Sequence, residues 1–87
     1  MEIKIIESRD FESICLTAQR YGKNSEASIT LAQAWRRYKE YLQAPELSKE
    51  LRELISNQLR VMEPILISLD IVKLGWYEKF RGSRYLN

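Results

Sequence analysis

Hydrophobic residues recur every three or four positions along most of this chain, which is the spacing of one face of an α-helix. The first stripe predicts a helix that begins near Asp10 and ends at Tyr21. Ser8 or Asp10 can cap its amino-terminal end, and Gly22 suits its carboxyl-terminal end. The stripe consists of Phe11, Ile14, Cys15, Ala18 and Tyr21.

The segment before this helix carries Ile3, Ile5 and Ile6. It is compatible with a short strand, an extended arm or the first turn of a helix. We therefore assign residues 1–9 to an amino-terminal arm of undetermined structure.

A second helix is predicted from about residue 26 to residue 43. Ser25 offers its N-cap, and Glu26 lies in the first turn, where the helix dipole favours a negative charge. Pro45 disfavours a continuation past Ala44. The stripe of this helix consists of Leu31, Trp35, Tyr38 and Leu42, widened by Ala34 and Tyr41.

Pro45 suits the first turn of a third helix, and the apolar stripe keeps its phase as far as and beyond Pro64. One kinked helix is therefore compatible with the pattern. A single helix over residues 45–81 would be roughly 55 Å long, too long for a compact domain of this size. We favour a break near Glu63, followed by a fourth helix that ends at Gly82. The third stripe consists of Leu47, Leu51, Leu54, Ile55, Leu59, Val61 and Met62, with Gln58 as its polar member.

The last predicted helix is apolar on two faces. Its main stripe continues through Ile65, Leu69, Val72, Trp76 and Phe80, and a second row consists of Ile67, Ile71 and Leu74. A helix of this kind is either central in its own bundle or covered by a partner. Ile67, Ile71 and Leu74 are therefore candidate partner-binding residues.

These helices predict an all-α fold, a bundle of three or four helices in one domain over residues 1–87, with a short tail over residues 83–87.

There is no histidine and only one cysteine, which excludes His-containing metal sites and Cys clusters. Cys15 lies between apolar residues and is interpreted as a small buried side chain. A lone free thiol is typical of the reducing cytoplasm. The charged residues 1–7 are not typical of a signal peptide, and the apolar runs are too short for a membrane-spanning helix, so we expect neither.

Basic and aromatic residues alternate in two segments, one around Trp35 and one near the carboxyl terminus. Basic side chains neutralise phosphates, and aromatic rings accept stacked bases. The candidate nucleic-acid-binding residues are Arg36, Arg37, Lys39, Lys79, Arg81 and Arg84. A helical wheel separates Arg37 from Arg36 and Lys39, so a purely solvating role is the alternative. Trp35, Tyr38, Trp76 and Phe80 are expected in the core, whereas Tyr41, Tyr77 and Tyr85 are freer to stack.

The sequence contains no Gly-rich phosphate loop, no metal-ligand spacing and no nucleophile motif. A small helical domain also offers little depth for a pocket that excludes water. We therefore expect a protein that is not an enzyme, with no metal, no cofactor and no small-molecule substrate.

In size and character, the chain resembles the small helical subunit of CRISPR effector complexes. The resemblance rests on the segment from Trp35 to Lys39 and on Lys79, Arg81 and Arg84. It implies other protein subunits as partners and contacts with RNA or single-stranded DNA that involve no cleavage. The alternative is a protein-protein interaction module, such as a phage- or plasmid-type inhibitor or adaptor, that binds through Ile67, Ile71 and Leu74.

Overall fold

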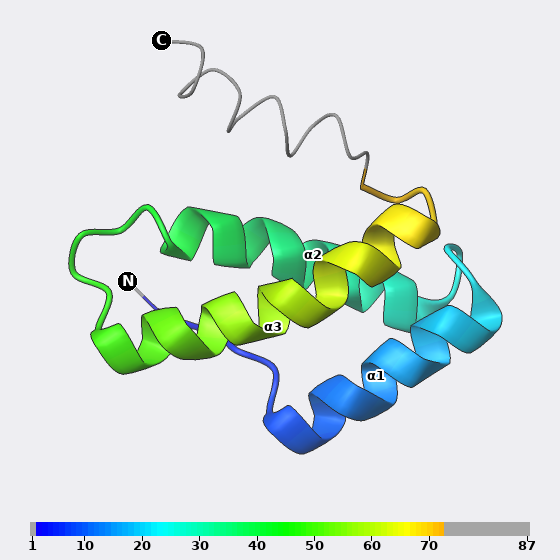
Figure 1. Cartoon of the computed structure of the whole chain (residues 1–87), viewed down its shortest axis with the longest axis horizontal. Helices are drawn as coiled ribbons and strands as arrows, with labels where there is room; N and C mark the ends of the chain where they lie inside the picture. Colours follow the sequence, from blue (N-terminus) through cyan, green and yellow to red (C-terminus); the bar gives the residue numbers. More distant parts are fainter. Residues whose placement is uncertain (1, 73–87) are drawn as a thin grey trace, which may run out of the picture.

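The computed structural model describes residues 2–72 and contains three helices, each of which runs back along the one before it (Figure 1). They are α1 (Ser8–Tyr21), α2 (Glu26–Tyr41) and α3 (Lys49–Ser68), and the described part of the chain contains no strand. The predicted all-α bundle is confirmed. The predicted tail, and the part of the fourth helix beyond residue 72, lie outside the described residues.

The predicted bounds of the first two helices are nearly right. Helix α1 begins at Ser8, and neither Ser8 nor Asp10 caps it, because Glu7 is the N-cap residue and makes no side-chain cap bond. It ends at Gly22, whose φ of 87° is a conformation that favours glycine. Helix α2 begins after Ser25 as predicted, and the Ser25 hydroxyl accepts the Ser28 N–H at 3.2 Å.

Helix α3 differs from the prediction at both ends. It begins at Lys49 rather than Pro45, because Ser48 supplies the N-cap and accepts the Leu51 N–H at 3.2 Å. The predicted break near Glu63 is wrong, since the helix continues through Pro64 to Ser68. Pro64 is exposed, so its ring and its missing N–H lie on the solvent side of the helix.

The helical hydrogen bonding stops one turn after Pro64, in a Schellman motif. Asp70 has a φ of 61° and donates its N–H to the carbonyl of Ile67 at 3.0 Å. Ile71 donates to the carbonyl of Leu66 at 2.9 Å. These two bonds satisfy carbonyls that the helix end leaves without partners.

All three helices contribute to one core. Its members are Phe11, Cys15, Ala18, Leu31, Ala34, Tyr38, Tyr41, Ile55, Leu59, Met62, Ile65, Leu66 and Val72. The burial of Cys15 is thus confirmed. Burial also raises the pKa of its thiol, which keeps it in the protonated form.

Several predicted core positions are wrong. Tyr21, Leu54 and Val61 are exposed, whereas the other predicted members Ile55, Gln58, Leu59 and Met62 of the third stripe are buried in α3. Trp35 is only partly buried against the core. Tyr41, which we expected to be free to stack, is buried, and its hydroxyl accepts the Lys4 N–H at 3.1 Å.

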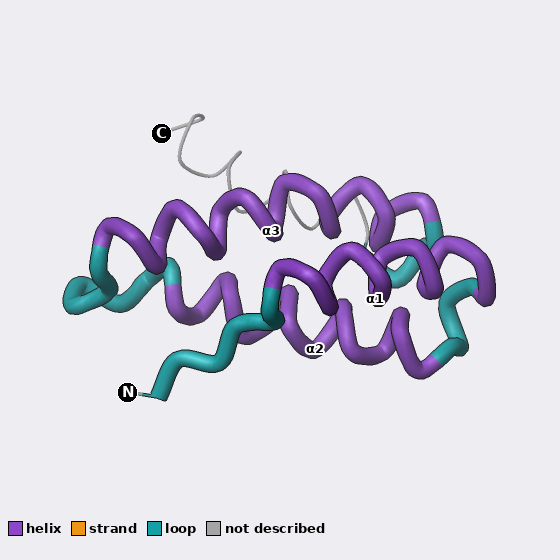
Figure 2. Tube along the Cα trace, turned by 90° about the horizontal axis from the view of Figure 1, so that it is seen from below, coloured by secondary structure: helices purple, strands orange, loops and turns teal. Residues whose placement is uncertain are grey.

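The amino-terminal segment is an extended arm, which decides between the three predicted possibilities. It runs from the first turn of α1 as a loop (Figure 2) and makes hydrogen bonds to α2 and α3. Ile3, Ile5 and Ile6 are partly buried against the core.

Candidate nucleic-acid interface

The three basic residues predicted on α2 have different surroundings. Arg36 is exposed, whereas Arg37 and Lys39 are partly buried. The turn of the helix separates Arg37 from the other two, as expected. The structure therefore does not bring these three residues together as one cluster.

Lys39 is engaged within the protein. Its Nζ lies 3.4 Å from Oε2 of Glu63 and 5.6 Å from the ring centroid of Trp35. The Trp35 indole N–H donates to the same Glu63 oxygen at 3.3 Å. The Glu63 side chain is only 14% exposed, so this ion pair is well shielded from water. Lys39 is consequently a structural residue that links α2 to α3, and less charge is left for a phosphate.

Arg37 lies on the other side of α2, beside Tyr38. Its Nε is buried and has no hydrogen-bond partner within residues 2–72. Burial raises the pKa of Tyr38, and both the hydrogen bond from the Ile6 backbone and the positive charge of Arg37 partly oppose that increase. Part of the Arg37 side chain therefore lies within the bundle, close to Tyr38.

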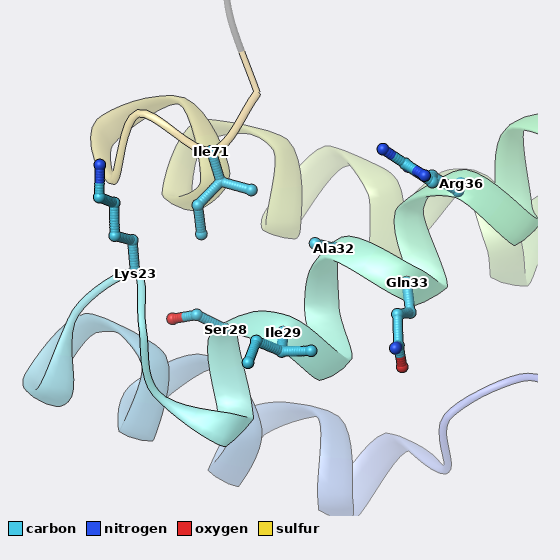
Figure 3. A pocket seen from close by; sticks show the side chains of 7 residues that line it. All are labelled: Lys23, Ser28, Ile29, Ala32, Gln33, Arg36 and Ile71. Atoms are coloured by element: carbon cyan, nitrogen blue, oxygen red, sulfur yellow. The ribbon is translucent and has the colours of Figure 1, made fainter.

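Arg36 instead shares a shallow pocket with Lys23, a residue that sequence reasoning did not select. The pocket has a volume of about 180 Å³. Figure 3 shows Lys23 and Arg36 at opposite sides of it, with Ile71 between them. The other lining residues are Ser28, Ile29, Ala32 and Gln33.

A local turn brings Lys23 to this pocket. Gly22 ends α1 with a positive φ, and the Ser25 and Ser28 hydroxyls both donate to the Gly22 carbonyl, at 2.8 and 2.6 Å. Ser28 is fully buried by this arrangement. The turn fixes the chain next to the first turns of α2. The sequence feature that could have pointed to Lys23 is Gly22, because a chain that ends its helix at residue 22 turns at residue 23 towards the following helix.

The electrostatics of the pocket favour an anion. Neither Lys23 nor Arg36 lies within salt-bridge distance of a carboxylate in residues 2–72, whereas Lys4, Arg9 and Lys39 do. Ile29, Ala32 and Ile71 give the pocket an apolar part, and the Gln33 amide adds a group that can donate and accept hydrogen bonds. The arrangement offers two cationic side chains to an anion such as a phosphate or a carboxylate.

The remaining predicted site residues are only partly visible. Ile67 and Ile71 are partly buried against the core of their own chain, and Ile71 also lines the pocket. Leu74, Lys79, Arg81 and Arg84 lie outside the described residues. Their predicted roles stay predictions.

Within residues 2–72, no group of acidic, cysteine or histidine side chains is placed to hold a metal ion. In the same part of the chain, no helix has the length and apolar character needed to cross a membrane. Comparison of the chain with protein-family models, with curated proteins and with solved structures found no match.

Proposed function

We propose that this protein is a non-enzymatic helical subunit of a larger nucleoprotein assembly, and that it contacts nucleic-acid backbone. The carrying observation is that Lys23 and Arg36 line one pocket and have no carboxylate partner in residues 2–72. Phosphates are the ligands that such paired cations bind in nucleic acids. The free thiol of Cys15 supports a cytoplasmic setting for this assembly.

The proposal redistributes the predicted contacts. Arg36 keeps its role and gains Lys23 as a neighbour, while Lys39 contributes less because its charge is paired with Glu63, and Arg37 lies on another side of α2. Lys79, Arg81 and Arg84 remain proposed contacts. The likeness to the small subunit of CRISPR effector complexes belongs to this proposal, with RNA or single-stranded DNA as the bound strand and other subunits as partners.

The test is a titration of a labelled single-stranded oligonucleotide with the full chain at about 50 and about 200 mM salt. The double variant Lys23→Glu/Arg36→Glu should weaken binding by tenfold or more and lower the salt slope by roughly 1.4, because each phosphate contact to a single strand contributes roughly 0.7. Lys49→Glu/Arg60→Glu is the matched control, since it makes the same change in net charge at exposed residues of α3.

Three outcomes are informative. A loss confined to the Lys23/Arg36 variant supports the pocket as the phosphate site. Equal losses in both variants indicate attraction by net charge alone, and no binding by the unmodified chain at low salt overturns the proposal. Gln33→Ala tests base reading separately, because an amide that reads base edges changes the ratio of affinities between homopolymers.

One observation favours a second candidate function, a protein-protein interaction module of the inhibitor or adaptor type. Ile29 is 50% exposed and lies in the same pocket as the two cations. An exposed apolar side chain next to unpaired charge is also suited to an acidic protein segment. Native purification separates the two functions: a partner protein that stays bound after nuclease treatment and is lost in Ile29→Gln favours the module.

A further inference from the structure

The amino-terminal arm is held by hydrogen bonds to its backbone from side chains of α2 and α3. The Tyr41 hydroxyl accepts the N–H of Lys4 at 3.1 Å, and the Tyr38 hydroxyl accepts the N–H of Ile6 at 2.9 Å. The Gln58 amide donates to the carbonyl of Ile6 at 2.7 Å. We call Tyr38, Tyr41 and Gln58 the arm site.

The arm site contacts the arm in the pattern of an extended peptide. Residues two apart in a strand point their N–H groups to the same edge. Lys4 and Ile6 are two apart, and both donate their N–H groups to tyrosine hydroxyls of α2. Two tyrosines one helical turn apart therefore receive these N–H groups as a neighbouring strand does.

The arm site and the attachment of the arm are on different elements. The hydrogen bonds that hold the arm come from α2 and α3, whereas the arm continues into α1. The junction at Glu7 has an extended backbone and no side-chain cap bond. Nothing in these contacts requires the arm and the site to belong to the same chain.

We propose that the arm site also accepts residues 2–7 of a second copy of this chain, which gives a dimer with reciprocally exchanged arms. Each copy then makes the same hydrogen bonds and buries the same Ile3, Ile5 and Ile6 side chains as in the monomer. The two states therefore differ mainly in the entropy of association, and high protein concentration favours the dimer. This proposal is independent of nucleic-acid binding.

The first experiment measures binding in trans. A labelled peptide with the sequence of residues 2–7 is titrated with the full chain and with the variant Ile5→Asp, whose own arm is weakened. The peptide should bind the variant tenfold or more tightly than the unmodified chain, because the resident arm no longer competes. The control peptide carries N-methyl groups at Lys4 and Ile6, which remove both donated hydrogens, and it should not bind.

The second experiment tests the exchanged dimer by complementation. Ile5→Asp keeps the site and loses the arm, whereas Gln58→Leu keeps the arm and weakens the site. A mixture of the two variants should sediment as a heterodimer at concentrations at which each variant alone is monomeric. Circular dichroism establishes that both variants are helical.

Two results overturn the proposal. If the N-methylated peptide binds as well as the unmodified one, the backbone hydrogen bonds do not define the site. If the peptide binds specifically but the mixture and the unmodified chain both stay monomeric at millimolar concentration, the arms are not exchanged between copies of the chain. The comparison of the two peptides on the unmodified chain tests whether the backbone hydrogen bonds define the site, even where a variant does not fold.

Discussion

The Tyr38 hydroxyl donates a hydrogen bond of 2.6 Å to Oε1 of Gln58, between α2 and α3. The same hydroxyl accepts the Ile6 N–H, and the Gln58 amide donates to the Ile6 carbonyl. Tyr38 is 0% exposed and Gln58 only 4% exposed. These buried polar groups satisfy one another in a closed ring of three hydrogen bonds, and the ring joins the arm to both helices.

Replacing Tyr38 by phenylalanine should lower the free energy of unfolding by about 1–3 kcal/mol. Phenylalanine fills the same space but leaves the Ile6 N–H and the Gln58 Oε1 without a partner inside the protein. Urea denaturation measures the change. Tyr21→Phe is the matched control, because Tyr21 is 66% exposed and its stability effect should be negligible. Equal stabilities for the two variants would show that the ring contributes nothing.

Alkaline pH should weaken the fold through the same tyrosine. Burial is the largest influence on Tyr38 and raises its pKa above the ordinary value of 10.0. The folded chain therefore holds a proton that the unfolded chain releases, so this contribution to stability is complete below pH 10 and is lost as the pH rises through the raised pKa. Ultraviolet titration of the tyrosines should show a late component that is missing in Tyr38→Phe. A titration in which both proteins behave alike would contradict this assignment.

The sequence predicted a helix end well where a single residue determines that end. Ser25 caps α2, and Gly22 ends α1, because a hydroxyl acceptor and a residue without Cβ are specific solutions for helix ends. The end of α3 was not predictable in this way. The residue with a left-handed backbone conformation at this end is Asp70, and aspartate does not mark a helix end as strongly as glycine does. The apolar stripe also continues past Asp70 in the sequence.

The candidate site depends on contacts between residues distant in the sequence. Glu63 pairs with Lys39 and Trp35 only because α2 and α3 pack against each other, and no local pattern contains that pairing. Similarly, the sequence pattern places Leu54, Gln58 and Val61 in one stripe of α3. Only the packed structure shows that Gln58 is buried, where the arm and Tyr38 offer it partners, while Leu54 and Val61 are exposed.

Truncation of a leucine to alanine should lower the free energy of unfolding in the core and leave it nearly unchanged on the surface. Leu31 is 0% exposed, whereas Leu16 is 61% exposed. Leu31→Ala should cost about 2–5 kcal/mol, because it removes buried methyl groups and leaves a cavity. Leu16→Ala removes the same atoms from an exposed position and should change stability by less than about 0.5 kcal/mol. Thermal denaturation compares the two, and similar melting temperatures would contradict the described core.

Asp70→Gly should stabilise the protein. The φ of 61° at Asp70 is a conformation that glycine adopts without the steric cost of a Cβ atom. The left-handed conformation costs a residue with a Cβ atom roughly 1–2 kcal/mol. Glycine is freer in the unfolded chain, which offsets part of that gain, so we expect the free energy of unfolding to rise by about 1 kcal/mol or less. Asp70→Ala is the control, because alanine has a Cβ and lacks the side-chain hydrogen bonding of aspartate, so it should destabilise the turn. A glycine variant less stable than the alanine variant would contradict the Schellman assignment.

Pro64→Ala tests whether α3 tolerates its proline at a cost. Proline has no N–H for the carbonyl of residue 60, and its ring crowds that carbonyl, yet α3 is helical from Lys49 to Ser68. Alanine restores the hydrogen bond at an exposed position, so no core packing is lost. The free energy of unfolding should therefore rise, by at most about 3 kcal/mol. Pro45→Ala, in the exposed turn before α3, should give no such gain, since no helical hydrogen bond is missing there. If Pro64→Ala instead destabilises the protein, the proline is needed to direct Ile65 and Leu66 into the core, and the helix depends on the local distortion that it causes.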